Sequence, residues 1–252
     1  MRLSRIYIAI GLSLGLPGVV MATTVTNISH SMTINVPGSN PFGSGRVSSV
    51  QQALNLLRDK RITRGYVTIR LTQDLSNVST ITINHPDSRR IILSGGGSYL
   101  RPHKLQFSGA GIRVIDGHTL GGIRSIKLVG PGAGRYSCGV RASDHSKVKN
   151  VDGVRAYNFK YGFCAYYNSV IDVNETIFHT VSVANLRAGF YATGNSKINL
   201  SAYSSSKIKS NHNKGYGYLA TMGSTINAHN FRGEGNKGAL DRVYTGGQIV
   251  RG

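Results

Sequence analysis

Basic side chains recur at matching places in the second half of this chain, with tyrosines among them. Four of them each follow a recurring asparagine by one or two residues: Lys160, Arg187, Lys214 and Lys237. Others occupy outward positions of predicted strands, beside two outward tyrosines: Arg141, Lys147, Lys197, Tyr166 and Tyr191. Such groups bind carboxylates and phosphates through charge-assisted hydrogen bonds, cation–π contacts and ring stacking. These nine residues are the predicted ligand-binding set; a solvated face that only discourages strand-edge aggregation is the alternative.

The overall charge points the same way. The 252 residues include 30 Lys and Arg against 10 Asp and Glu, a formal net charge of +20. So large an excess attracts anionic polymers and surfaces, such as acidic polysaccharides or cell-surface phosphate groups. Nucleic acid is the less favoured partner, because the chain has no recognised nucleic-acid-binding module.

Acidic residues are too few and too scattered to predict a catalytic site. Enzymes that cleave glycans bring carboxylates together as acid, base or nucleophile. Only Asp172 and Glu175 form a close pair in the repeat region, and Asp172 is predicted to face solvent. The other carboxylates there occupy mostly different positions: Asp144, Asp152, Glu234 and Asp241. We therefore predict no catalytic residue, and an enzyme remains the alternative.

Other chemical motifs are also weak. Asp144, His145 and Ser146 are adjacent, and neighbours on a strand point to alternate sides, so they cannot form a triad. The eight histidines share no repeating spacing, which argues for surface or turn positions rather than a metal site. The glycines at 95–97 lack the following Lys-Ser/Thr of a phosphate-binding loop. The sequence predicts neither a metal nor a cofactor.

A ten-residue module positions the basic and aromatic side chains. It reads Gly, apolar, any residue, Ala, three variable residues, Ser, any residue, Val or Ile, and it occurs at 139–148, 162–171, 189–198 and 217–226. The copies end 23, 27 and 28 residues apart, with a weaker fifth copy at 243–249. Short β-type runs that return at such a period predict stacked coils, that is, a solenoid.

Alternation within the module predicts which side chains form the core. The first apolar residue and the alanine should both point inward: Val140, Phe163, Phe190 and Tyr218, with Ala142, Ala165, Ala192 and Ala220. Asn158, Asn185 and Asn213 each lie four residues before a module glycine, with Asn236 as a near match, and are predicted at left-handed corners, bonded to the next coil. By the same alternation Cys138 and Cys164 point to opposite faces, which argues against a disulfide between them.

The N-terminal half adds other elements. Arg2 and Arg5 precede an apolar run at 6–20, which is short for a bilayer span of roughly 20 residues. Residues 1–22 are therefore predicted to be a signal peptide, with a retained membrane anchor as the alternative, so the mature protein is secreted, periplasmic or on the cell surface. A lead-in at 23–45 follows. Helical spacing at 47–57, with Ser48 or Ser49 as N-cap, predicts an amphipathic helix that covers the first coil, and strands begin at about 66.

Two stretches of the sequence resemble a known superfamily. The run VSSVQQALNLLRDKRITRGYVTIRL, followed by STITINHPDSRRIILSG, and the later IKLVGPG with its repeated modules resemble right-handed parallel β-helices of the pectate-lyase-like superfamily. The pattern is most similar to β-helix domains of phage tail fibres and tailspikes. The resemblance covers roughly 47–249 and implies a single-stranded right-handed parallel β-helix, all-β apart from a short N-terminal capping α-helix, at 46–252. A signal peptide departs from phage structural proteins and indicates a host-encoded secreted relative.

The sequence thus predicts a secreted, non-enzymatic β-helix protein that binds an anionic surface or polysaccharide, as an adhesin or attachment module does. A polysaccharide lyase or glycoside hydrolase of the same architecture is the first alternative, and a purely structural surface protein is the second. The last coil has no evident helix or polar cap after Ile249, so we expect a homo-oligomer, a trimer by analogy with tail proteins, or a truncated gene.

Overall fold

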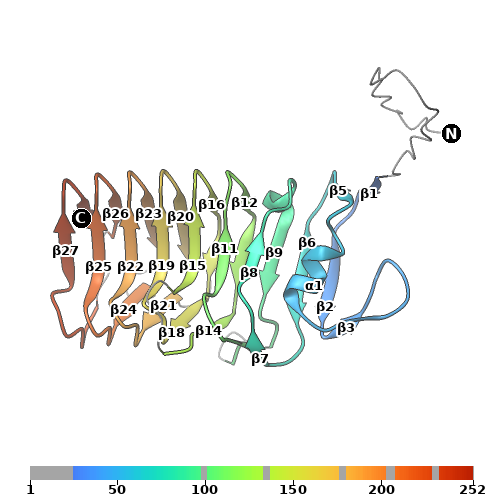
Figure 1. Cartoon of the computed structure of the whole chain (residues 1–252), viewed down its shortest axis with the longest axis horizontal. Coiled ribbons are helices and arrows are strands. Elements are labelled where there is room, and N and C mark those ends of the chain that lie inside the picture. The colour runs from blue at the N-terminus through green and yellow to red at the C-terminus, as the bar shows by residue number, and fades with distance from the viewer. Residues whose placement is uncertain are drawn as a thin grey trace, which may run out of the picture.

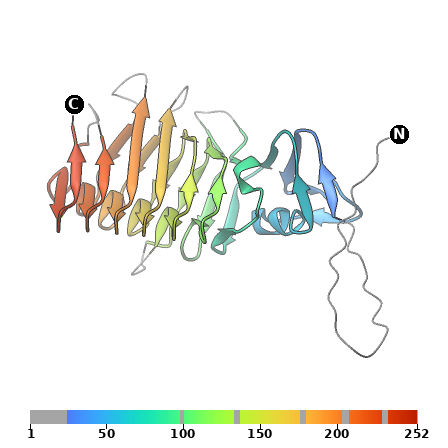
Figure 2. The same ribbon diagram turned by 90° about the horizontal axis from the view of Figure 1, so that it is seen from above.

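The structure is a computed structural model that describes residues 25–97, 101–132, 137–175, 180–202, 208–228 and 233–251. The predicted signal peptide at 1–22 lies outside these residues. The fold is mostly β, with the strands of its parallel sheets stacked along one long axis and a single short α-helix near the N-terminal end (Figures 1 and 2). Across the described ranges, no helix is both long enough and apolar enough to span a membrane.

Four parallel sheets make up most of the molecule. The seven-stranded sheet contains β8 (Ile81–Ile83), β11 (Ile112–Val114), β15 (Cys138–Ser143), β19 (Tyr161–Tyr166), β22 (Ala188–Thr193), β25 (Tyr216–Thr221) and β27 (Asp241–Tyr244). The β12–β28 sheet contains β12 (Thr119–Leu120), β16 (Lys147–Val148), β20 (Val170–Glu175), β23 (Lys197–Ala202), β26 (Thr225–Asn227) and β28 (Gln248–Val250).

The other two large sheets begin nearer the N-terminus. The β7–β24 sheet contains β7 (Leu75–Val78), β10 (Lys104–Phe107), β14 (Lys127–Val129), β18 (Arg155–Tyr157), β21 (Thr180–Val183) and β24 (Ile208–Asn211). The five-stranded sheet contains β2 (Met32–Val36), β6 (Val67–Leu71), β9 (Ile91–Ser94), β13 (Gly122–Arg124) and β17 (Val151–Asp152). Smaller pairs join β1 (Thr26–Ile28) to β5 (Lys60–Ile62), and β3 (Gly38–Ser39) to β4 (Arg46–Val47).

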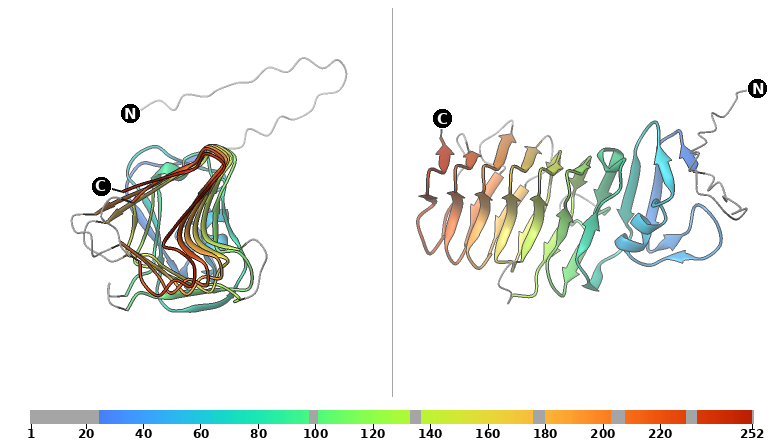
Figure 3. Two further views of the ribbon diagram at one scale, coloured as in Figure 1. Left: turned by 90° about the vertical axis from the view of Figure 1, so that its left-hand side faces the viewer. Right: turned by 45° about the horizontal axis from the view of Figure 1, so that its top comes forward.

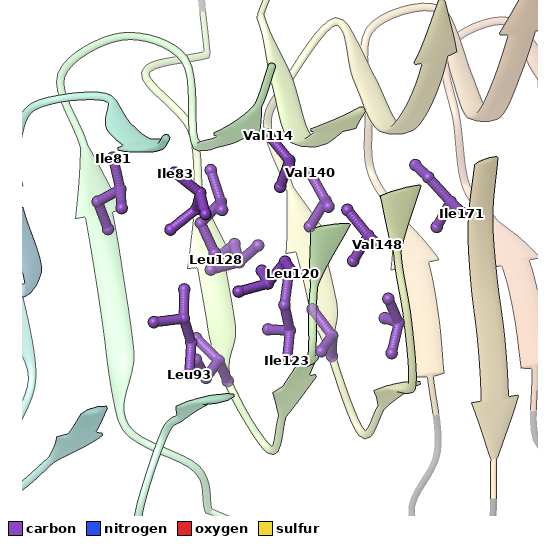
Figure 4. Close-up of a cluster of buried hydrophobic side chains, with 14 of the residues drawn as sticks. Ile81, Ile83, Leu93, Val114, Leu120, Ile123, Leu128, Val140, Val148 and Ile171 are labelled. Atoms are coloured by element: carbon purple, nitrogen blue, oxygen red, sulfur yellow. The ribbon is translucent and has the colours of Figure 1, made fainter. Parts of the chain in front are cut away.

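The predicted inward columns are confirmed. Val140 pairs in register with Phe163, Phe163 with Phe190, and Phe190 with Tyr218, and none of the four side chains is accessible to solvent. The three rings stack with centroids 5.0 and 5.5 Å apart. The module alanines form a parallel column beside them, so each large ring has a small neighbour. Aliphatic side chains from several sheets fill the same interior (Figure 4).

The module glycine interrupts the alternation of the strand, and this overturns the prediction for the cysteines. A Cβ on Gly139 would lie 2.9 Å from the Cβ of Ala156, a core residue, so Gly139 and Val140 both face inward. The residue before the glycine therefore faces outward, on the same side as the residue two places after it. Cys138 and Cys164 form a disulfide across β15 and β19, with Cα atoms 6.1 Å apart. The prediction that they point to opposite faces was wrong because it assumed unbroken alternation.

The module serines form a buried ladder at the corner between the seven-stranded sheet and the β12–β28 sheet. The N–H groups of Ser146, Ser169 and Ser196 each donate to the hydroxyl of the serine in the next layer, at 2.9 to 3.1 Å. Two successive residues with positive φ precede each serine; Asp144 and His145 have φ of 60° and 63°. Two left-handed residues turn the chain sharply, and these turns superimpose in a view along the long axis (Figure 3, left).

An asparagine ladder is present, but its register differs by one residue at its first member. Asn185 accepts from the N–H of Phe159, Asn213 accepts from the N–H of Asn185, and Asn236 accepts from the N–H of Asn213. Asn158 has the predicted left-handed conformation, with φ of 57°, but it is not part of the ladder because Phe159 takes the equivalent place. Asn185 and Asn213 also lack positive φ, which falls on the residues just before them, Ala184 and His212. Their role is therefore to pair buried backbone groups.

The predicted helix is found as α1 (Val50–Asn55), shorter than 47–57 and capped by Ser49, whose hydroxyl accepts from the N–H of Gln52 at 3.1 Å. Its buried face packs on the N-terminal end of the core. Close by, His85 is buried, contrary to the surface or turn positions predicted for histidines. Its Nε2 lies 2.9 and 3.0 Å from the carbonyl oxygens of Leu57 and Lys60, which ties α1 and β5 to β8.

The aromatic column ends in an ion pair. Asp241 takes the position that registers with Tyr218, and its carboxylate pairs with Arg251. The Arg251 guanidinium carbon lies 4.7 Å from the centroid of the Tyr218 ring. Charged groups of the last layer therefore cover the last stacked ring. Val243 and Ile249 of the weaker fifth copy continue the alanine and isoleucine columns.

Candidate ligand-binding site

The outer side of the seven-stranded sheet presents tyrosines and arginines along most of its length. We call this surface the tyrosine–arginine face and define it by Arg113, Arg141, Tyr161, Tyr166, Tyr191, Tyr216, Arg242 and Tyr244. Strand register gives the order along the axis: Arg113 pairs with Arg141, Arg141 with Cys164, Cys164 with Tyr191, Tyr191 with Leu219, and Leu219 with Arg242. Arginines thus lie at both ends of the face, with aromatic rings between them.

The middle of the face is a packed aromatic cluster rather than a loose surface. Tyr161 and Tyr191 stack with ring centroids 4.4 Å apart, and Tyr166 meets Tyr191 edge to face at 5.5 Å. The rings pack over the Cys138–Cys164 disulfide, whose two residues are buried. Burial raises the pKa of Tyr166 well above its ordinary value, so its hydroxyl stays protonated and can donate a hydrogen bond.

Cationic groups lie against these rings. The guanidinium carbon of Arg141 lies 4.7 Å from the centroid of Tyr166. At the start of β19, the Lys160 ammonium lies 5.4 Å from the centroid of Tyr161, and the Arg187 guanidinium lies 6.0 Å from the same ring. Such contacts hold the long side chains against the rings of the face.

The C-terminal end of the face holds a linked phenol pair. Tyr244 accepts hydrogen bonds from the Tyr216 hydroxyl and from Arg242, and these bonds lower the pKa of Tyr244. The same bond raises the pKa of Tyr216. Arg242 also covers the Tyr244 ring, with its guanidinium carbon 4.6 Å from the centroid. Tyr244 is 39% exposed, so this end of the face is open to solvent.

The face carries almost no negative charge. Among the residues of its seven strands, Asp241 is the one carboxylate, and it lies on the core side, paired with Arg251. Positive charge that is not neutralised locally produces a field that draws in anions. The arrangement can therefore hold acidic groups on the arginines and lysines, with flat rings under the rest of a bound chain.

The structure brings together seven of the nine predicted site residues. Arg141, Tyr166 and Tyr191 lie on the face itself, although the two tyrosines are half-buried rather than fully exposed. Four others precede β19, β22, β25 and β27 and line the edge where these strands begin: Lys160, Arg187, Lys214 and Lys237. Lys147 and Lys197 lie on the β12–β28 sheet, past the sharp corner, and Lys147 pairs with Asp172 at 2.7 Å.

Sequence reasoning missed five residues of the face: Arg113, Tyr161, Tyr216, Arg242 and Tyr244. Arg113 could have been found, because Gly111-Ile112-Arg113-Val114 fits the start of the module and pairs with β15. Tyr161 and Tyr216 each precede a module glycine, and the interrupted alternation there places them outside. Their outward orientation follows from the bend at the glycine, which the sequence pattern alone does not reveal.

The residues considered for catalysis do not form a reactive centre. Asp172 lies on the side of the strand opposite the buried Ile171, as predicted, but it is partly buried rather than freely solvated. It pairs with Lys147 and accepts from the Asn199 side chain at 2.8 Å, which is a structural role. Asp144 and His145 are exposed at the sharp corner, whereas Ser146 is buried in the serine ladder. In the part of the chain that the structure describes, no three His, Cys, Asp or Glu side chains gather as a metal site would require.

Comparison of the chain with protein-family models, with curated proteins and with solved structures finds no match. The tyrosine–arginine face therefore has to be interpreted from its own chemistry.

Proposed function

We propose that this protein is a secreted, non-enzymatic binding protein that holds an anionic polysaccharide on its tyrosine–arginine face. The observation that carries the proposal is two groups of aromatic rings along one side of the sheet, flanked by cations, with no carboxylate on the same side of the described strands. The first group is Tyr161, Tyr166 and Tyr191, and the second is Tyr216 and Tyr244. Guanidinium groups bind acidic substituents, and tyrosine rings pack against the apolar faces of sugar rings. A polymer can follow the face across several strands and contact many weak sites at once.

We further propose that the chain winds as a single right-handed parallel β-helix, as in the tail-fibre and tailspike domains that the sequence resembles. Each stretch of 23 to 28 residues that separates the module ends supplies one strand to the seven-stranded sheet and one to the β12–β28 sheet. Like side chains stack between successive stretches, as coils of a β-helix require. This architecture suits attachment, because it repeats a binding element at a regular spacing along a rigid axis.

Secretion is supported by two independent features. The basic start and apolar run at 1–22 have the composition of a signal peptide. The Cys138–Cys164 disulfide fits an oxidising compartment such as the periplasm or the cell exterior, because thiols are kept reduced in the cytosol.

The test is polymer binding by matched lysine variants. We would measure the binding of the secreted protein to dextran sulfate and to polygalacturonate over a series of salt concentrations. Lys214→Gln/Lys237→Gln removes two charges at the edge of the face. Lys147→Gln/Lys197→Gln removes the same charge from the β12–β28 sheet. We expect the first pair to weaken binding several-fold and to flatten its salt dependence, and the second pair to leave both nearly unchanged.

Equal losses in the two variant pairs would overturn the assignment of the face, because they would show only a response to net charge. A parallel assay with single-stranded DNA checks polymer class, and equal affinity for DNA would contradict polysaccharide binding. Release of unsaturated or reducing ends from either glycan would contradict the non-enzymatic role.

A further inference from the structure

We propose that Arg113 and Arg141 together bind one tetrahedral oxyanion, a sulfate or phosphate ester. This inference rests on the polysaccharide-binding function proposed above and specifies the substituent that the polymer carries. Binding of a small inorganic anion to the two arginines can be tested without any polymer.

The two arginines lie side by side on the outer side of the sheet. They are register partners on β11 and β15, neighbouring parallel strands about 4.8 Å apart. The next positions in the same column are Thr82 on one side and Cys164 on the other, and neither carries a charge to offset the pair. Like charges directly opposite on neighbouring strands destabilise a sheet, so the repulsion between the two guanidinium groups is an electrostatic cost to the fold.

In the described chain, no carboxylate pairs with either arginine to offset that cost. Neither arginine forms an ion pair with a described residue, and the carboxylates nearest in sequence, Asp116 and Asp144, are three residues further on at the exposed corner. The Nε atoms of both arginines are shielded from solvent and have no hydrogen-bond partner. Two shielded donors therefore lack acceptors at one place, which a bound acceptor would supply.

The geometry of the pair favours a tetrahedral anion over a carboxylate. A guanidinium presents its N–H groups as a planar fork that matches two oxygens of an anion. A carboxylate has two oxygens and is filled by one fork, whereas a sulfate or phosphate ester has three terminal oxygens to share between two forks. The Tyr166 ring under the Arg141 guanidinium holds that fork in place. One ester group can thus accept hydrogen bonds from both side chains, and it places negative charge between the two guanidinium groups.

The first experiment uses inorganic sulfate and inorganic phosphate. We would follow thermal unfolding of the wild type, of Arg113→Gln/Arg141→Gln, and of Arg70→Gln/Arg124→Gln, whose exposed arginines lie on the five-stranded sheet. At equal ionic strength set with chloride, we expect sulfate and phosphate to raise the wild-type Tm in a saturable way. The Arg70/Arg124 variant should keep this rise and the Arg113/Arg141 variant should lose it. A saturable rise that survives in the Arg113/Arg141 variant, or that is missing from the wild type, overturns the inference.

The second experiment separates this inference from the proposed function. Wild type should bind dextran sulfate about tenfold more tightly than polygalacturonate, which carries carboxylates alone. Dextran phosphate in a third arm distinguishes a sulfate source from a phosphate source. Arg113→Gln/Arg141→Gln should lose the preference while still binding polygalacturonate. Binding of all polymers without preference contradicts the oxyanion site and leaves the proposed function intact. Saturable stabilisation by sulfate with no polymer binding contradicts the proposed function alone.

Discussion

Removal of the Cys138–Cys164 disulfide tests how much this bond between β15 and β19 stabilises the fold. The bond closes a stretch with a sequence separation of 26 residues, for which the chain-entropy relation gives about 3.5 kcal/mol of stabilisation. We therefore expect Cys138→Ala/Cys164→Ala to lower the free energy of unfolding by about that amount. The two sulfurs are buried beneath Tyr161, Tyr166 and Tyr191, so alanine avoids the burial of new polar atoms.

The assay is urea denaturation followed by tyrosine fluorescence, with and without a reducing agent under conditions that open the bond. Reduction should bring the wild type close to the double variant and leave the variant itself unchanged. A thiol reagent should find no free thiol in the unfolded, unreduced wild type. Two reactive thiols in that sample, or a midpoint that reduction does not move, would refute the proposed link between β15 and β19.

Three further changes probe the core, the serine ladder and the N-terminal contacts. Ala192→Asp puts a carboxylate into the apolar core, where no described residue offers a charge partner, and the cost of several kcal/mol should abolish soluble protein; normal yield and melting would contradict the stacking register. Ser196→Ala leaves the buried N–H of Ser169 without its acceptor, so urea denaturation should show a loss of about 1–3 kcal/mol. Burial alone would raise the pKa of Asp87, but hydrogen bonds from Arg61 and from the Ile62 N–H outweigh it and lower that pKa. Ionised Asp87 therefore stabilises the fold above the ordinary carboxyl pKa, and this stabilisation is lost as the pH falls through the lowered pKa of Asp87. The free energies of unfolding of wild type and Asp87→Asn should therefore differ at neutral pH and converge in acid. A constant difference across the pH range would be inconsistent with this role.

The repeated module made the interior predictable and left the outside only partly so. Matching letters at a fixed period placed Phe163, Phe190 and Tyr218 in one column, because burial demands the same side chain at the same place in each layer. The outward-facing columns are not constrained by burial in the core, and their residue types change from layer to layer. For example, Arg141, Cys164 and Tyr191 lie in one column although their side chains are chemically different.

The errors about the disulfide and about Tyr161 and Tyr216 have one physical source. Strict alternation was applied across a glycine at which two successive residues face inward. That single bend reverses the side of every residue before the glycine, which hid the disulfide and the outward positions of Tyr161 and Tyr216. The offset at Asn158 arises from the length of a connection: Phe159, which takes the ladder position, lies three residues before Gly162, whereas Asn185 lies four residues before Gly189.

The most direct test of the account is hydroxyl-radical footprinting of the tyrosines with and without saturating dextran sulfate. We expect protection of the tyrosines that line the tyrosine–arginine face: Tyr166, Tyr191, Tyr216 and Tyr244. Tyr66, which is 49% exposed beside the five-stranded sheet, and Tyr157 on the β7–β24 sheet serve as internal controls and should react as before. Protection of Tyr66 and Tyr157, or unchanged reactivity of the four tyrosines of the face, would contradict the claim that this face is where the polymer binds.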